Sequence, residues 1–184
     1  MDVIELLPQL RLLRFPVGQA YLWDDDAEAT LIDAGPIGSG RAIAEAVTAL
    51  GHALSDVRRI VLTHFHEDHV GGAAELAEPS GAEVLAHALD APVVRGEVPS
   101  PPSVFEDWER PLHAEAVRLL PPGEPLRPRQ VTDLSHGDTL PFGAGDARVV
   151  HVPGHTQGSI ALHLPAHGVL FTGTRWPRRR VQGR

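Results

Sequence analysis

The chain has 184 residues, of which 42% are hydrophobic and 22% are charged, and its formal net charge at pH 7 is −8. The length suits one domain with its own core, the negative charge argues against binding to a nucleic-acid backbone, and no apolar run is long enough to cross a membrane. Because cysteine is absent, disulfides and thiolate metal ligands are excluded. The acidic N-terminus lacks the basic and apolar regions of a secretory signal, so we expect a cytoplasmic protein.

The first third of the chain predicts a sheet followed by a helix. Short apolar segments at residues 10–15, 20–23 and 30–32 are separated by turn signals, which is typical of adjacent antiparallel strands. Apolar residues then recur at helical spacing over residues 43–50. We expect Ser39 to cap the start of this helix.

The rest of the chain predicts short alternating elements. Strands are expected at residues 59–62 and 83–86, with a helix between them over residues 70–77. The proline-rich stretch 96–128 predicts little regular structure apart from a helix near residues 112–120, and we expect a lid, a binding loop or a flexible surface excursion there. The last organised part predicts three strands, at residues 147–152, 160–164 and 169–172.

The most informative segment is Thr63-His64-Phe65-His66-Glu67-Asp68-His69-Val70-Gly71-Gly72. Three histidines and one aspartate lie within six residues, directly after the strand predicted at residues 59–62. A strand end delivers such side chains to one point, and imidazole and carboxylate are suitable ligands for zinc and iron. The spacing is specific enough to predict a metal site.

A second histidine turn lies in the other half of the chain, at Val152-Pro153-Gly154-His155-Thr156-Gln157-Gly158-Ser159. Proline and glycine predict a sharp turn at a strand end, with His155 at its apex. Alone, such a histidine is more often an ordinary loop residue. A catalytic zinc typically takes three protein ligands and leaves one position for water, so this histidine would complete a set with His64 and His66.

Taken together, these segments resemble the metallo-β-lactamase-fold hydrolases, and among them the glyoxalase II-like enzymes. The resemblance rests on T-H-x-H-x-D-H-x-G-G, on P-G-H-T-x-G-S, on Phe171-Thr172-Gly173 and on the strand end Leu31-Ile32-Asp33-Ala34-Gly35, in that family's order and spacing. It covers residues 10–173 and implies an α/β (α+β) fold, a four-layer αββα sandwich with metals at one edge between two sheets. We expect this domain to span residues 1–174, with an incomplete C-terminal half.

The resemblance also implies a role for each site residue. A second metal would begin with Asp68 and His69, and Asp68 would orient the nucleophile or act as its base. Asp33 is expected to organise the loop by hydrogen bonds rather than to bind metal. The first metal, zinc with iron or manganese as alternatives, would be bound by His64, His66 and His155.

Two features depart from the family's pattern. Thr174, a poor metal ligand, takes the place of the aspartate that bridges the two metals, and the sequence stops at Arg184, without the family's further histidine and covering helices. Five of the 16 basic residues lie in the last ten positions. We expect residues 175–184 to be a disordered basic tail, either genuine or the product of truncation or frameshift. One firmly bound metal, weakened activity and self-association through uncovered sheet surface are further expectations.

The resemblance implies that the chain hydrolyses a small-molecule ester, thioester or lactone with a metal-bound hydroxide. Two alternatives stay open. One is an iron-dependent oxidoreductase of the same fold, similar to a persulfide dioxygenase, and the other is a metal-binding remnant with impaired catalysis. The expected partner is a small-molecule substrate, not nucleic acid or a membrane.

Overall fold

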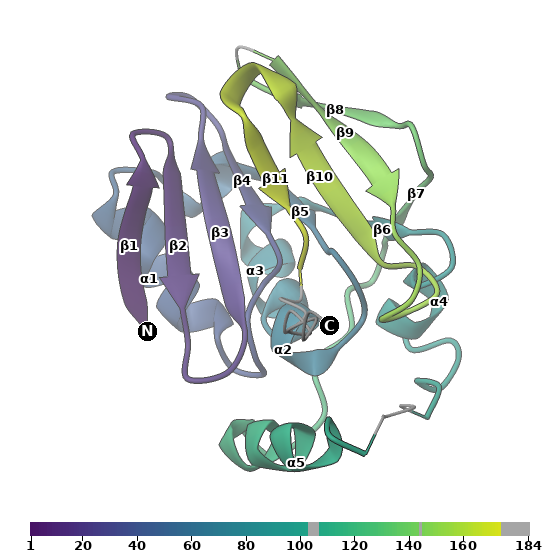
Figure 1. Ribbon diagram of the computed structural model, residues 1–184. Coiled ribbons are helices and arrows are strands. Elements are labelled where there is room, and N and C mark those ends of the chain that lie inside the picture. Colours follow the sequence, from purple (N-terminus) through teal and green to yellow (C-terminus); the bar gives the residue numbers. More distant parts are fainter. Residues whose placement is uncertain (103–106, 144, 174–184) are drawn as a thin grey trace, which may run out of the picture.

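The structure is a computed structural model that describes residues 1–102, 107–143 and 145–173. Two β-sheets packed face to face form its centre, and helices cover the outer side of the first sheet (Figure 1). The first sheet has its strands in chain order: β1 (Asp2–Leu7), β2 (Leu10–Arg14), β3 (Gln19–Asp24), β4 (Ala29–Ile32), β5 (Val57–Val61), β6 (Glu83–His87) and β7 (Thr132–Leu134). The second sheet has the order β11 (Val169–Phe171), β10 (Ile160–Leu164), β9 (Gly145–His151) and β8 (Thr139–Phe142).

The pairing within the first sheet changes at β4. Strands β1 to β4 are antiparallel neighbours, whereas β4 to β7 pair in parallel. Parallel neighbours need crossover connections, and these carry the helices of the domain. The helical elements are α1 (Gly40–Ala49), the 3₁₀ turn η1 (Leu54–Asp56), α2 (Glu67–Val70), α3 (Ala73–Ser80), α4 (Ala91–Val94) and α5 (Arg110–Leu119), with a further 3₁₀ turn η2 (Pro165–His167) between β10 and β11.

Side chains of the first sheet alternate between two cores. Leu31 and Ile60 pack in the core that includes α1 and α3, whereas the next residues, Ile32 and Val61, pack in the core shared with the second sheet. Successive side chains of a strand point to opposite faces, so both faces of the central strands are buried and their sequences are apolar throughout. This arrangement fixes the C-terminal ends of β4 and β5 side by side.

The second sheet is covered differently. Its inner face supplies the core with residues such as Phe142 and Leu162, whereas Arg148 and His163 on alternate positions are exposed. In the part of the chain that the structure describes, α1, α3 and α4 pack on the first sheet, and α5 contains no buried residue. The described residues therefore supply the α, β and β layers of the predicted sandwich.

Most predicted elements are present, with differences of one to three residues at their ends. Strands β1, β7 and β8 and helix α4 were not predicted, and the helix expected over residues 70–77 is divided into α2 and α3. Ser39 is at the N-cap of α1, but its hydroxyl donates to the carbonyl of Ala34 and does not cap the helix. Thr174 and the tail 175–184 lie outside the described residues. Among the helices of the described segments, none has the length and apolar character needed to span a bilayer.

Candidate metal centre

The first candidate loop begins shortly after the end of β5, at the buried Thr63. His64 is 2% exposed and His66 is partly buried, and His66 directly precedes α2, the helix that contains Asp68 and His69. The amides of His69 and Val70 donate to the carbonyl of His66. A turn of helix at the end of a parallel strand therefore holds the histidines at the sheet edge, as their spacing predicted.

The two glycines that end the segment allow this loop to pack against the strand end of β4. A Cβ at Gly71 would lie 2.1 Å from the backbone nitrogen of Ile37, and one at Gly72 would lie 2.7 Å from the carbonyl oxygen of Ala34. Side chains do not fit at such distances, so only glycine permits this approach. The amide of Gly71 donates to Gly35 and that of Gly72 to Ala34, which fastens the two loops together.

Asp33 is fully buried beneath the first loop and organises it by hydrogen bonds. Its carboxylate accepts from the amide of Thr63 at 2.7 Å, from the hydroxyl of Thr63 at 2.9 Å and from Nδ1 of His69 at 2.8 Å. Asp33 has a left-handed backbone with φ of 59°. A non-glycine residue in this region is uncommon, and such strain is concentrated at functional sites.

The same contacts determine which nitrogen of His64 is available. The hydroxyl of Thr63 has one proton, which it donates to Asp33, so it accepts a hydrogen bond from Nδ1 of His64 at 3.0 Å. With its proton on Nδ1, His64 has an unprotonated Nε2. A hydrogen bond that fixes the histidine tautomer in this way is typical of metal ligands.

The second candidate loop brings His155 from between β9 and β10 to the first loop. Nε2 of His155 lies 2.8 Å from Nδ1 of His66, although the two residues are 89 positions apart in the sequence. One nitrogen from each of His64, His66 and His155 lies within 4.8 Å of the others, and among the described residues no other group of this kind is found. Nitrogen ligands of a tetrahedral zinc at about 2.0–2.1 Å are about 3.3 Å apart, so the cluster has a suitable size for one ion.

Electrostatics favour the ligand form of these histidines. Burial lowers the pKa of His64 well below its ordinary value, and it also lowers the pKa of His66, with help from His155, to about 4. Both rings are therefore neutral near pH 7, which is the form that binds a metal. Neutral imidazoles suit zinc, and also iron, so the residues present fit the metal that the sequence predicted.

Asp68 and His69 lie beside this cluster. Nε2 of His69 is 3.4 Å from a carboxylate oxygen of Asp68, and the ring of His69 lies 4.1 Å from the ring of His64 between centroids. Burial alone would lower the pKa of His69, but the carboxylates of Asp33 and Asp68 raise it to about 10. The structure thus places Asp68 and His69 next to the three histidines, with His69 held by Asp33. His69 is protonated near pH 7 and would have to lose a proton to bind a metal.

Sequence reasoning did not identify Asp90. It is 1% exposed, and its carboxylate accepts hydrogen bonds from Thr156 and Gly158 in the second loop. In the sequence, Asp90 precedes Ala91-Pro92 and has the pattern of an ordinary helix N-cap. The hydrogen bonds of Asp90 to the second loop depend on how the two sheets pack, which the sequence does not reveal.

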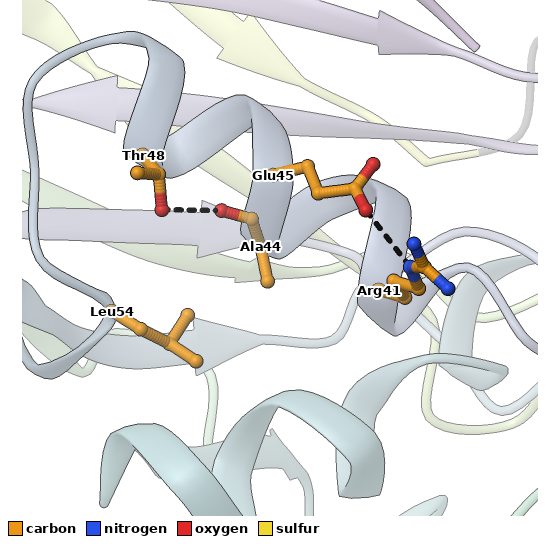
Figure 2. Close-up of a pocket in the computed structure, with 5 residues that line it drawn as sticks. All are labelled: Arg41, Ala44, Glu45, Thr48 and Leu54. Carbon is orange, nitrogen blue, oxygen red and sulfur yellow. Dashed lines mark hydrogen bonds and ion pairs between the residues drawn. The ribbon is translucent and has the colours of Figure 1, made fainter.

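A shallow hollow elsewhere in the molecule carries no comparable chemistry. Figure 2 shows it against α1 and η1, lined by Arg41, Ala44, Glu45, Thr48 and Leu54. Its polar side chains are occupied with each other or with the helix, since Arg41 pairs with Glu45 and Thr48 donates to the carbonyl of Ala44. No histidine lines it, and the histidine cluster remains the candidate site.

Comparison with known proteins agrees with this geometry. The family model of the metallo-beta-lactamase superfamily matches residues 13–174. The chain is 34% identical over 154 residues to the hydroxyacylglutathione hydrolase of Gloeobacter violaceus, which covers 83% of this chain and 46% of that protein. It is 35% identical over 115 residues to the enzyme of the same name from Cereibacter sphaeroides, covering 62% of this chain and 32% of that one. The solved structure of MEM-A1, a subclass B3 metallo-beta-lactamase from a soil metagenome library, matches with a TM-score of 0.68 and 28% identity over 89% of this chain and 57% of that chain.

Two facing sheets with a histidine cluster at their common edge define the class of the molecule as a metallo-β-lactamase-type sandwich, and this confirms the predicted fold. The chain belongs to the metallo-beta-lactamase superfamily. It spans less than half the length of the two hydroxyacylglutathione hydrolases that it matches.

Proposed function

We propose that the chain is a metal-dependent hydrolase of a small-molecule thioester or ester. The observation that carries the proposal is the convergence of His64, His66 and His155 from two distant segments, together with the hydrogen bonds that leave Nε2 of His64 unprotonated. The similarity to proteins named hydroxyacylglutathione hydrolase favours a thioester.

In this proposal the three histidines bind one metal ion, for which zinc is the best match to the ligands. Such an ion, when bound, supplies a Lewis acid that makes water nucleophilic near neutral pH and polarises an acyl carbonyl. His64 is buried on the protein side of the cluster, whereas His155 is exposed. Substrate and water would therefore reach the cluster from the side of His155.

Asp68 would orient the attacking water or accept its proton. Burial opposes the charge of this carboxylate, but its hydrogen bond to His69 and the charge of that ring lower its pKa. The side chain of Asp68 is 29% exposed, whereas that of His69 behind it is 5% exposed. An ionised carboxylate at the solvent side of the cluster is placed to act as a base.

A second metal would bind weakly in this proposal. Asp68 and His69 are two ligands, fewer than a firm site needs, and Thr174 replaces the carboxylate expected from the family's pattern. Metal analysis of the purified chain after dialysis should find about one zinc per chain. A Thr174→Asp variant should retain more. Two tightly held ions in the unaltered chain would contradict this part of the proposal.

The function is tested with the full chain and a panel of thioester and ester substrates. We expect turnover that a chelator abolishes and added zinc restores, and that His66→Ala abolishes permanently. His163→Ala, which removes an exposed histidine of β10, is the matched control and should behave like the unaltered chain. Equal turnover by His66→Ala, or no turnover by the zinc-loaded chain on any substrate, would refute the proposal. Iron as the native metal, with oxidation of a persulfide substrate by dioxygen, would favour the oxidoreductase alternative instead.

A further inference from the structure

The carboxylate of Asp90 holds the second loop of the candidate centre by two hydrogen bonds. One oxygen accepts from the hydroxyl of Thr156 at 2.6 Å, and the other accepts from the amide of Gly158 at 2.8 Å. The backbone of Phe65, between His64 and His66 of the first loop, lies close enough to this carboxylate to lower its pKa. Thr156 directly follows His155, so this buried side chain contacts the immediate neighbour of His155 and lies beside the first loop.

The protons in this network have one consistent assignment. Thr156 donates its hydroxyl proton to Asp90, so the hydroxyl of Ser159, 2.8 Å away, must donate to Thr156. Ser159 in turn accepts from the amide of Thr156 at 2.9 Å. Every polar group of the turn that faces Asp90 is thereby satisfied, which holds the loop in a single conformation.

Asp90 makes these contacts in place of the local role that its position suggests. It is the N-cap residue of α4, yet its side chain forms no capping hydrogen bond. The turn approaches it so closely that a Cβ at Gly158 would lie 2.5 Å from the carboxyl carbon of Asp90. The side chain of Asp90 therefore stabilises the turn between β9 and β10 and does not cap α4.

We propose that Asp90 is a positioning residue for His155: its carboxylate fastens the turn between β9 and β10 to the segment between β6 and α4, so that His155 is held opposite His64 and His66 before any metal binds. This inference rests on the proposed metal site. It adds a residue that acts through its neighbours and touches neither metal nor substrate. A ligand held in place in advance loses less freedom on binding.

The first test measures loop position without metal. Hydrogen exchange of the Thr156 and Gly158 amides is followed in the metal-free full chain for the unaltered protein, Asp90→Ala and Asp90→Asn. We expect exchange at least about tenfold faster in Asp90→Ala, because both amides lie in the turn that it releases. Asp90→Asn keeps an acceptor for Gly158 and should stay close to the unaltered chain. Asp56→Ala removes another carboxylate that accepts from a backbone amide, that of Ala53, and serves as the matched control.

The second test measures zinc affinity by competition with a chelator. Asp90→Ala should bind zinc about 10–100-fold more weakly, the usual effect of losing a residue that supports a ligand, with Asp90→Asn restoring most of the affinity. Thr156→Val removes one hydrogen bond and retains the carboxylate of Asp90. Both measurements are repeated on this variant because it disturbs the turn less than Asp90→Ala does. Unchanged exchange and affinity in Asp90→Ala and Thr156→Val would overturn the inference. Absence of zinc binding by the unaltered chain would instead refute the proposed function, and the exchange measurement would still decide whether Asp90 fastens the loop.

Discussion

The two loops that carry the candidate ligands are held in different ways. The first, residues 63–70, follows a buried parallel strand and continues into α2, and its supporting carboxylate, Asp33, comes from the strand next to it in the same sheet. The second, residues 152–159, joins two antiparallel strands, and its support, Asp90, comes from the segment that follows β6 of the other sheet. The first loop is thus built into one sheet, whereas the second depends on the packing of two. Variants that remove Asp33 or Asp90 should show separately how the first loop depends on one sheet and how the second loop depends on the packing of two.

The largest effect is expected from His155→Ala. This change removes one of the three candidate ligands, in the exposed second loop, and leaves the buried first loop intact. Zinc affinity should therefore fall by more than the 10–100-fold typical of a supporting residue, with little loss of stability. Zinc competition and urea unfolding of the metal-free chain measure the two quantities. His163→Ala should change neither. Retention of stoichiometric zinc by His155→Ala would show that the second loop contributes no ligand.

Asp33→Ala should instead reduce stability. It leaves the amide and hydroxyl of Thr63 and the ring of His69 without their buried acceptor, and breaking a buried charged pair costs about 3–5 kcal/mol. Urea unfolding of the metal-free chain measures the change. Asp26→Ala is the control, because Asp26 also has a left-handed backbone, with φ of 62°, but is exposed. A similar, small loss in both variants would mean that Asp33 does not support the first loop.

Gly158→Ala tests the close contact in the second loop. Its Cβ would lie 2.5 Å from Oδ1 of Asp90 and 2.7 Å from the backbone nitrogen of the same residue, so the turn must move. We expect a destabilisation of about 1–3 kcal/mol, as for other overpacked sites, together with weaker zinc binding. Gln157→Ala changes an exposed side chain of the same turn and should have little effect on either. Normal zinc affinity in Gly158→Ala would show that the turn tolerates displacement.

The smallest expected effect is on the titration of Tyr21, which depends on the negative charge of Asp33. Tyr21 is the only tyrosine of the chain, and burial, followed by the negative charge of Asp33, raises its pKa above the ordinary value of 10.0. An ultraviolet titration should therefore show ionisation above pH 10, and Asp33→Asn should move it partway down. Since the folded chain keeps this proton longer than the unfolded chain, stability should fall as pH rises through this interval. An unchanged titration in Asp33→Asn would show that the charge of Asp33 does not contribute to the raised pKa of Tyr21.

Local sequence was sufficient to predict the first loop. The apolar strand before His64, the spacing of the histidines and the paired glycines are all features of one continuous segment, and the structure places them as that pattern indicates. The antiparallel strands from Leu10 to Ile32 were predicted for the same reason, since alternation and turns are local properties.

The features that were missed depend on distant parts of the chain. Strand β7 has three residues and is stabilised mainly by its pairing with β6 and by the packing of Leu134, so its own sequence carries little signal. Asp90 is 66 positions from Thr156, and a helix start explains its sequence context equally well. The helix expected near residue 70 was divided because Gly71 and Gly72 pack against the β4 loop, which helical periodicity cannot show.

The 89-residue separation between His66 and His155 affects the order in which parts of the chain fold. Contacts between residues so far apart close late, because a long loop must be ordered before they form. Strands β2 to β6 can pair while β9 and β10 are still unfolded, but the three imidazoles meet only once the turn between β9 and β10 has docked. Capture of a zinc ion by all three rings would therefore report that the second sheet has docked on the first, and a chain synthesised only as far as β8 could not perform it.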